Sequence, residues 1–156
     1  MKVLFLDFDG VLNTASYRKN LDLYLRSPIE REKLSFIKKI VDATDAEIVL
    51  STSWRRYWQF NGAHTDKTGI LIDKLFSEYG VTVTSKTPSK NPLRRDEEID
   101  LWLRDRYFTK IESYCILDDV AEIFPAETAR NHLVLTDGEI GITDSDVKKA
   151  ISMLLY

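Results

Sequence analysis

Two aspartates one residue apart, Asp7 and Asp9, stand at the end of the apolar segment that begins the chain. Residues 2–8 are typical of a buried strand, and Gly10 lets the backbone turn away directly afterwards. Because ligands of open α/β sheets bind beyond the carboxyl ends of the strands, both carboxylates are expected to face a site. Mg²⁺ relieves the repulsion between two such acids. One carboxylate can then attack phosphorus, while the other donates and accepts protons.

This first acid pair also has plainer explanations. Asp and Gly are common in turns, so the pair can simply close a strand. An EF-hand calcium loop requires further oxygen ligands at alternate positions and a distal Glu. Val11 and Leu12 follow Gly10 here, which excludes that loop. A turn and a metal-dependent site remain as the two alternatives.

A run of small hydroxyl residues follows the second buried strand, predicted at residues 47–51. Ser51, Thr52 and Ser53 precede Trp54 and Arg55. Hydroxyls and backbone N–H groups at a strand-to-helix turn bind phosphate oxygens, and an arginine nearby can pair with phosphate. The same residue types are also ordinary helix caps, so this segment alone does not separate the two roles.

A second pair of adjacent acids, Asp118 and Asp119, follows the strand predicted at residues 113–117. Together with Asp7 and Asp9 it can complete a shell of oxygen ligands for Mg²⁺. One of these acids can instead cap the helical turn that follows. A cap needs only one Asp, so two acids on a strand expected beside the first favour a metal site.

Four cations lie between the third and fourth predicted strands: Lys86, Lys90, Arg94 and Arg95. A fixed cation at this place can pair with a nucleophilic carboxylate and with phosphate. A solvated run of charges is the usual explanation for such a cluster. The residue types alone leave both roles open.

Alternating strands and helices must position these residues. Strands are predicted at residues 2–8, 47–51, 81–85, 113–117 and 132–135, and helices at residues 27–43, 70–79, 96–106 and 143–155. Ser27-Pro28-Ile29-Glu30 is a capping box that begins the first helix. The alternation predicts a three-layer, Rossmann-like α/β fold with a central, mostly parallel sheet and helices on both faces. Residues 13–26 are a polar connection too short for a separate cap domain, so residues 1–156 are expected to form one domain.

Composition narrows the function further. The chain has 156 residues and a net charge of −3, which argues against a broad basic surface for duplex nucleic acid. The lone Cys115 forms no internal disulfide and fits a reducing compartment. No apolar run is long enough to span a membrane, and Asp7 interrupts the N-terminal one too early for a signal peptide. A cytoplasmic protein without membrane contact is expected.

An acid pair, a hydroxyl, a cation and a second acid pair occur in that order, each beside a strand end. In this pattern the chain resembles the haloacid dehalogenase (HAD) superfamily of phosphohydrolases, with the four motifs spanning Asp7 to Asp119. The resemblance implies a Mg²⁺-dependent phosphatase that works through an aspartyl-phosphate. Asp7 matches the nucleophile and Asp9 the general acid and base. The implied metal ligands are Asp7 and Asp9 with Asp118 or Asp119.

The resemblance also assigns groups that bind phosphate. Thr52 matches the phosphate-binding hydroxyl, with Ser51 and Ser53 as register alternatives. Arg95, which heads a predicted helix, is the favoured catalytic cation, and Lys90 is the alternative. Further substrate contacts are expected from Gly10, Ser51, Ser53, Arg55 and Lys90.

Short strings also resemble a small branch found in or beside RNA-repair proteins, namely Ser53-Trp54-Arg55 and residues 95–99. Capless members tend to act on macromolecular phosphates or to borrow a lid. The resemblance therefore implies a nucleic-acid end or a nucleotide as substrate, or a lid supplied by a partner or a second copy. Trp54 and Trp58 either form an aromatic lip for single-stranded nucleic acid or, as aromatic residues do more often, pack in the core.

Three other functions compete with the phosphatase. They are a receiver-like domain that stores phosphate on an aspartate, a non-catalytic binding module on the same fold, and a metal-dependent nuclease. A receiver has no need of a second acid two residues after the phosphorylated one, so Asp9 argues against it. A single nucleophile-like Asp7 with a downstream hydroxyl and cation suits phosphomonoester hydrolysis better than nuclease chemistry.

Overall fold

Five strands form one parallel sheet in the computed structural model, which describes residues 1–156. The strands are β1 (Lys2–Leu6), β2 (Glu47–Leu50), β3 (Val83–Lys86), β4 (Ser113–Asp118) and β5 (Leu133–Leu135). Their order across the sheet is β3-β2-β1-β4-β5, so β1 lies at the centre. All five predicted strands are present and all pair in parallel, which confirms the Rossmann-like α/β fold.

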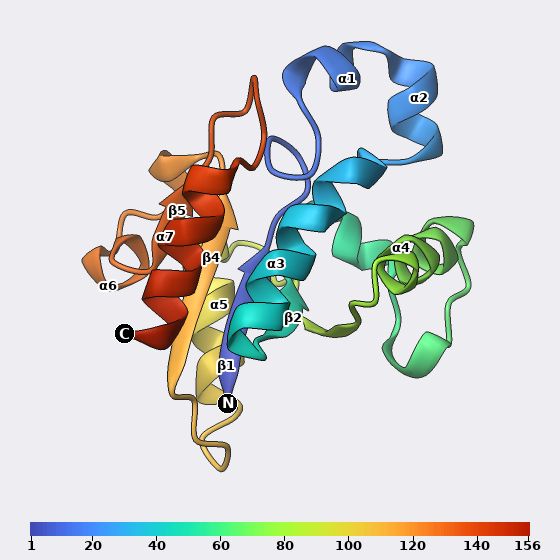
Figure 1. Cartoon of the computed structure of the whole chain (residues 1–156). Coiled ribbons are helices and arrows are strands. Elements are labelled where there is room, and N and C mark those ends of the chain that lie inside the picture. The colour runs from blue at the N-terminus through green and yellow to red at the C-terminus, as the bar shows by residue number, and fades with distance from the viewer.

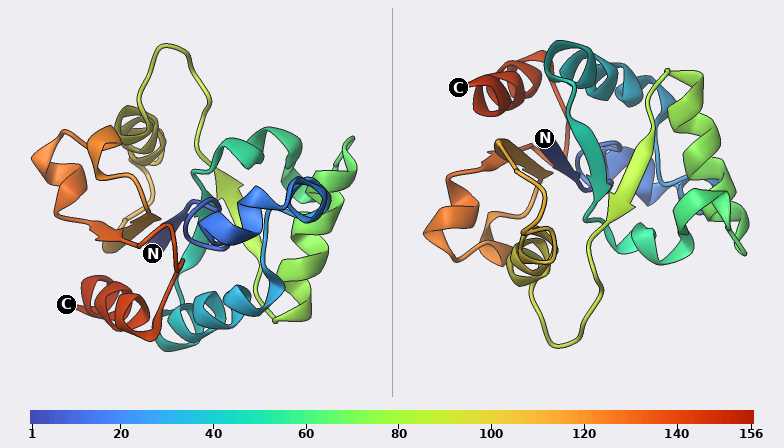
Figure 2. Two further views of the ribbon diagram at one scale, coloured as in Figure 1. Left: turned by 90° about the horizontal axis from the view of Figure 1, so that it is seen from above. Right: turned by 90° about the horizontal axis from the view of Figure 1, so that it is seen from below.

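Helices cover both faces of the sheet. The α-helices are α1 (Ala15–Lys19), α2 (Leu21–Arg26), α3 (Leu34–Thr44), α4 (Lys67–Glu78), α5 (Arg95–Arg104), α6 (Glu127–Arg130) and α7 (Asp144–Leu155). The 3₁₀ helices are η1 (Arg31–Lys33), η2 (Ser53–Tyr57), η3 (Phe60–Gly62) and η4 (Ala121–Ile123). Along the strands, α3 and α7 lie on one side of the sheet, and α5 and α6 lie on the other (Figures 1 and 2).

Alternate residues of β1 point into two separate hydrophobic cores. Leu4 and Leu6 belong to the larger core, to which α3, α4 and α7 contribute. Val3 and Phe5 belong to the smaller core, to which α5 and α6 contribute. Because successive side chains of a strand point to opposite faces, the central strand is buried on both. The predicted burial of Cys115 is also confirmed, and burial raises the pKa of its thiol to about 12.

The helix predicted to begin at Ser27 begins later. The 3₁₀ turn η1 comes first, and α3 starts at Leu34. Glu30 does not close a capping box, because its Oε2 accepts a hydrogen bond of 2.8 Å from the backbone N–H of Thr14. The Ser27 hydroxyl instead bonds within its own turn, to the backbone N–H and carbonyl of Ile29. The capping-box prediction is therefore wrong, since Glu30 holds the preceding segment in place.

That preceding segment is helical rather than an irregular connection. Helices α1 and α2 occupy it, and neither buries a residue. Its ends are held together by the Thr14–Glu30 bond and by a 3.0 Å hydrogen bond from the Tyr17 hydroxyl to the carbonyl of Ser27. Figure 1 shows both helices beyond the carboxyl ends of the strands. We call residues 14–30 the lid; it is a short two-helix segment, and no separate cap domain is present.

The other helix boundaries lie close to those predicted. Helix α4 starts three residues early, at Lys67, because the side chain of Asp66 caps it. Gly69 thus lies inside α4, where a Cβ atom would come within 2.2 Å of the Tyr57 carbonyl oxygen. The predicted cap of α7 at Thr143 is confirmed.

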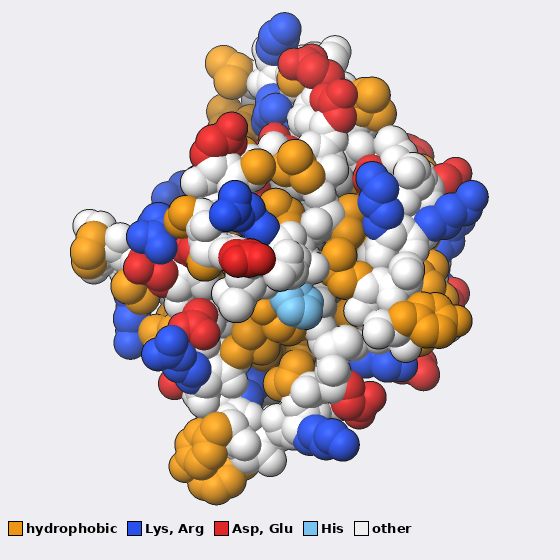
Figure 3. Space-filling model, turned by 90° about the vertical axis from the view of Figure 1, so that its left-hand side faces the viewer, with side chains coloured by type: hydrophobic (Ala, Val, Ile, Leu, Met, Phe, Trp, Pro, Cys, Tyr) orange, Lys and Arg blue, Asp and Glu red, His pale blue; other side chains and the backbone are white.

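The surface adds two observations. None of the helices has the length and apolar character required to cross a lipid bilayer. On the face that Figure 3 shows, Lys and Arg side chains are interspersed with Asp and Glu, as expected from a net charge of −3.

Candidate active site

Three carboxylates come together where the connections of the sheet diverge. Asp7 follows β1, Asp118 is the last residue of the neighbouring β4, and Asp119 comes next. The chain leaves β1 toward β2 and leaves β4 toward β5, so the two strand ends flank a crevice of the kind that binds ligands. Oxygen atoms of the three carboxylates lie within 4.8 Å of one another. We call Asp7, Asp118 and Asp119 the carboxylate cluster.

Two members of the carboxylate cluster are withdrawn from water, and the third, Asp119, is half-buried. Asp7 is 5% exposed and Asp118 is completely buried. Burial raises the pKa of Asp7 to about 6; Arg95 opposes the shift and Asp118 adds to it. Burial is also the main cause that raises the pKa values of Asp118 and Asp119. Three negative charges in such a place are poorly compensated by the protein alone.

Arg95, the first residue of α5, is the cation that contacts the cluster. Its Nη1 lies 2.9 Å from Asp7 Oδ2 and also donates a hydrogen bond to Asp118 Oδ2. The two carboxylates raise the pKa of Arg95 against the opposing effect of burial, so the guanidinium stays charged. One side chain therefore joins the ends of β1 and β4.

The other cations of that run point elsewhere. Lys86 donates to the backbone carbonyls of η2 and its C-cap, and Arg94 pairs with Asp96 and Glu97. Lys90 is exposed, and its side chain makes no hydrogen bond or ion pair. Among the four predicted candidates, the structure brings only Arg95 to the carboxylates.

Gly10 makes room for Asp119. A Cβ atom at Gly10 would lie 2.0 Å from Asp119 Oδ2, and one at Gly138 would lie 2.7 Å from the same oxygen. The Gly10 carbonyl is held by the Thr136 hydroxyl at 2.7 Å. The side chain of Asp119 thus lies against two glycine backbones, with no space for a larger residue at Gly10.

Gly10→Ala is expected to destabilise the protein much more than Gly62→Ala. Both glycines have a positive φ, +75° and +69°, so both substitutions carry similar backbone strain. Only Gly10 has a neighbour that must move, because a Cβ at Gly62 meets nothing within 4 Å. Urea unfolding should show Gly10→Ala less stable than Gly62→Ala by about 2 kcal/mol. Equal losses would contradict the tight contact with Asp119.

Asp9 lies beside the carboxylate cluster rather than in it. Its Oδ1 accepts a 2.9 Å hydrogen bond from Asn13 Nδ2, and its Oδ2 accepts bonds from Tyr24 Oη (2.9 Å) and Trp54 Nε1 (3.4 Å). The group of carboxylates within 4.8 Å of one another does not include it. The structure thus brings three of the four predicted metal ligands together and leaves the Asp9 side chain outside.

Among the predicted hydroxyls, those of Ser51 and Thr52 are completely buried, and that of Ser51 is free to bind a ligand. Register pairs Leu6 with Leu50, so Asp7 and Ser51 are the next residues on neighbouring strands. Ser51 Oγ is the one buried side-chain polar atom without a hydrogen-bond partner. Thr52, favoured from sequence, caps η2 through the N–H of Trp54 at 3.4 Å, although its side chain also lowers the pKa of Asp7 through a hydrogen bond. Ser53 is exposed.

Arg55 has a structural role instead of the predicted contact with substrate. All five of its N–H donors are used: Nε bonds to the carbonyl of Thr87, Nη1 to the carbonyls of Ser51 and Thr52, and Nη2 to Pro88 and Glu98. The pair with Glu98 is 2.7 Å long and almost completely buried. No donor is left for phosphate, so that prediction is wrong.

Asn13, Tyr24 and Glu98 help to build the site, although the sequence pattern assigns none of them a role. Asn13 is completely buried, and its Oδ1 accepts hydrogen bonds from the Gly10 N–H (3.0 Å) and from Arg18 (2.8 Å). Its place three residues after Gly10 could have indicated a side chain that caps this turn. Tyr24 and Glu98 carried no comparable sequence signal, because their partners lie 15 and 43 residues away.

The two tryptophans near the site divide between the two predicted roles. Trp58 is 2% exposed and lies in the larger core. Trp54 is only partly buried, meets Tyr24 edge to face at 5.4 Å between ring centroids, and reaches Asp9. Core packing is confirmed for Trp58, whereas Trp54 packs against the larger core and also reaches the site.

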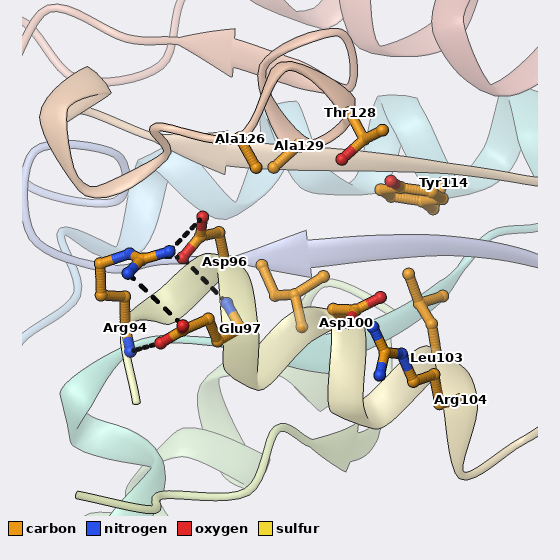
Figure 4. Close-up of a pocket in the computed structure, with 11 residues that line it drawn as sticks. Arg94, Asp96, Glu97, Asp100, Leu103, Arg104, Tyr114, Ala126, Thr128 and Ala129 are labelled. Atoms are coloured by element: carbon orange, nitrogen blue, oxygen red, sulfur yellow. Dashed lines mark hydrogen bonds and ion pairs between the residues drawn. The ribbon is translucent and has the colours of Figure 1, made fainter. Parts of the chain in front are cut away.

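A separate groove lies on the face covered by α5 and α6. It has a volume of about 240 Å³ and runs between these helices and β4 (Figure 4). Its acids are paired with bases from the same helix or its cap, Asp96 with Arg94 and Asp100 with Arg104. The groove contains no residue of the carboxylate cluster, so we assign it no part in the chemistry.

Comparison with known families places these residues in context. Residues 3–147 match the family described as the HAD domain in Swiss Army Knife RNA repair proteins. The chain belongs to this family. The matched residues include the whole carboxylate cluster, Arg95 and the lid, and the family resemblance seen in the motifs is confirmed. No curated protein and no solved structure matches the chain.

The carboxylate cluster of this HAD domain suits a divalent cation. One guanidinium pairs with two of the three carboxylates, so the cluster holds more negative than positive charge. All the donor atoms are oxygens, which is the donor type that Mg²⁺ prefers, and Mg²⁺ commonly binds through few carboxylates and keeps several waters. Asp7, Asp118 and Asp119 are therefore the candidate metal ligands.

Proposed function

We propose that this HAD domain is a Mg²⁺-dependent phosphomonoesterase that forms an aspartyl-phosphate on Asp7. The observation that carries the proposal is the carboxylate cluster bridged by Arg95, with the unpartnered hydroxyl of Ser51 beside it. The nucleophile and the cation are in contact, the Thr52 side chain hydrogen-bonds to the nucleophile, and the free hydroxyl of Ser51 follows the end of the neighbouring strand. This set suits a phosphoryl group, whose transfer depends on positioning and on charge stabilisation.

In the first step, a carboxylate oxygen of Asp7 forms a bond to phosphorus. The bond from phosphorus to the ester oxygen breaks, and Asp9 gives a proton to that leaving oxygen. Arg95 and the Ser51 hydroxyl donate hydrogen bonds to phosphoryl oxygens. Bound Mg²⁺ would neutralise part of the charge on the phosphoryl oxygens.

In the second step, Asp9 accepts a proton from water as the water oxygen bonds to phosphorus. The bond between phosphorus and Asp7 breaks, which releases inorganic phosphate and restores the Asp7 carboxylate. Asp9 lies beside the carboxylate cluster, and three neutral donors hold its carboxyl group in one place. Because it stays at the same position, the same residue can give the proton in the first step and accept one in the second. A receiver-like domain needs no such group.

We also propose that the substrate is a phosphorylated nucleic-acid end or a nucleotide. The rim of the site carries Tyr24, Trp54 and Tyr57 with neighbouring ring centroids 5.4 and 5.9 Å apart, and Arg56 lies over Tyr57. Aromatic rings with an adjacent arginine are what single-stranded nucleic acid stacks on. The RNA-repair description of the family supports the same class of substrate.

The test is phosphate release from 4-nitrophenyl phosphate and from 5′- and 3′-phosphorylated oligonucleotides. We expect release with Mg²⁺ and a loss of about 100-fold or more in EDTA, because the carboxylate cluster then repels the phosphate. Preference for an oligonucleotide end over the aryl ester would support the nucleic-acid substrate. Stoichiometric phosphorylation without release would instead indicate a phosphate-storing domain.

A further inference from the structure

The lid contacts the proposed acid and base directly through one hydroxyl. Tyr24 Oη donates to Asp9 Oδ2 at 2.9 Å, and the Trp54 side chain hydrogen-bonds to the same hydroxyl. Seen from above, α1 and α2 lie over the strand ends (Figure 2, left). The contact therefore joins a surface helix directly to the proposed acid and base.

Apart from Tyr24, whose ring also meets Trp54 edge to face, little holds α2 in place. The helix has six residues and buries none of them. Its three leucines, Leu21, Leu23 and Leu25, are 65%, 44% and 68% exposed. So short a helix is not stable by itself, and segments with few buried contacts open at low free-energy cost. Tyr24 is thus the main connection between α2 and the site, whereas the start of the lid is held by bonds from the Ala15 N–H to the Gly138 carbonyl (2.9 Å) and from Arg18 to Asn13 (2.8 Å).

The same bond also limits where Asp9 can point. Tyr24 and Trp54 both donate to Oδ2, while Asn13 fixes Oδ1. Trp54 lies on η2, Asn13 lies in the turn after β1, and Tyr24 alone comes from the lid. Burial and the neighbouring Asp9 raise the pKa of Tyr24 to about 12, so its hydroxyl remains a donor.

We propose that Tyr24 is a positioning residue, which fixes the Asp9 carboxyl for proton transfer when the lid closes over the substrate. This inference rests on the proposed phosphatase function. Closing the lid then completes the acid and base as it covers the phosphate. The chain would supply its own lid, in place of one borrowed from a partner or a second copy.

A positioning role for Tyr24 makes the effect of its loss depend on the leaving group. The departing oxygen of phenyl phosphate needs a proton, whereas that of 2,4-dinitrophenyl phosphate leaves readily without one. We expect Tyr24→Phe to lower kcat/KM by about 10- to 100-fold for phenyl phosphate and by less than about 3-fold for the dinitrophenyl ester. Because kcat/KM covers the steps up to departure of the leaving group, slow hydrolysis of the aspartyl-phosphate does not mask the effect.

Tyr17→Phe is the matched control. It removes a hydroxyl from the same lid, where Tyr17 bonds to the carbonyls of Ser27 and Leu23 and makes no contact with Asp9. It should not change the ratio of the two kcat/KM values. Hydrogen exchange of residues 21–26 gives a second readout, and we expect faster exchange in Tyr24→Phe than in the wild type.

The outcomes separate the two proposals. If the wild type is active but Tyr24→Phe loses equally on both esters, or behaves as Tyr17→Phe does, the positioning role is overturned and the phosphatase stands. Unchanged exchange at residues 21–26 overturns the closing role of the bond. A wild type that releases neither phenol nor phosphate overturns the proposed function and this inference together.

Discussion

Asp7→Asn abolishes phosphate release, with an expected loss of about 10⁴-fold or more, while the protein stays folded. The amide nitrogen and oxygen of Asn are poor nucleophiles, so no bond to phosphorus forms. The control is Asp42→Asn, the same change on an exposed residue of α3 that pairs with Lys38. Phosphate release by each variant is measured at saturating Mg²⁺, with circular dichroism to verify folding.

The same substitution is expected to stabilise the metal-free protein at neutral pH. The folded-state pKa of Asp7, about 6, lies above its ordinary value of 3.8, because burial outweighs the pairing with Arg95. The wild type has its full stability while Asp7 is protonated, below about pH 4. It loses stability as the pH rises through about 6 and Asp7 ionises inside the folded protein. Asn has no such loss, so in EDTA at pH 7.5 Asp7→Asn should be about 1–3 kcal/mol more stable than the wild type.

The pH dependence distinguishes this effect from a general one. The advantage of Asp7→Asn in urea unfolding should shrink as the pH falls from 7.5 to 5, and Mg²⁺ should stabilise the wild type more than the variant. If Asp7→Asn is inactive but shows neither the pH-dependent gain in stability nor the weaker response to Mg²⁺, Asp7 makes only an ordinary structural contact. Retained activity would remove Asp7 as the nucleophile and with it the proposed mechanism.

The parts of the site that were predictable from sequence are those set by local pattern. Asp7 and Asp118 were identifiable because each ends an apolar strand, and parallel strands bring their carboxyl ends to one edge. Arg95 was favoured over its neighbours because it heads a helix. In each case a short stretch of chain determines both the element and the end at which the residue lies.

The parts that were not predictable depend on contacts between distant segments. Arg55 is an arginine like Arg95 and lies shortly after the end of β2, so the sequence favours a substrate contact. In the structure Glu98 and four backbone carbonyls accept all of its hydrogen bonds. Glu30 was expected to cap its own helix, but the N–H of Thr14 holds it. Which partner a polar group finds is decided by the folded arrangement, since each alternative satisfies the same donors and acceptors.

The choice between Thr52 and Ser51 shows the same limit on a smaller scale. Both hydroxyls follow β2, and either can bind phosphate. Their roles differ only because the chain turns into η2 at Thr52, which makes that residue the cap and leaves Ser51 Oγ without a partner. A prediction from sequence fixes the segment but not the residue within it, because one step along a strand reverses the side to which a side chain points.

Arg95→Ala is expected to remove most activity and to destabilise the metal-free protein, which is opposite in sign to the stability effect of Asp7→Asn. Arg95 is 19% exposed and its guanidinium bridges Asp7 and Asp118. Removing one partner of a buried ion pair leaves uncompensated charge, at a cost of about 3 kcal/mol. Loss of a fixed donor to the phosphoryl group lowers kcat by about 10³-fold.

Arg94→Ala is the matched control for Arg95→Ala. The neighbouring side chain is 51% exposed and pairs with Asp96 and Glu97, away from the carboxylate cluster. Asp96 is 4% exposed but also accepts a hydrogen bond from the N–H of Glu97, so the loss of Arg94 should cost about 1 kcal/mol, less than that of Arg95, and leave phosphate release nearly unchanged. Both variants are measured by urea unfolding, in EDTA and in Mg²⁺, and by phosphate release.

Mg²⁺ should recover more stability in Arg95→Ala than in Arg94→Ala, because it neutralises the carboxylates that Arg95 leaves behind. Equal behaviour of the two variants would mean that the charge balance of the site does not depend on Arg95, and the case for a divalent cation built on that balance would fail with it.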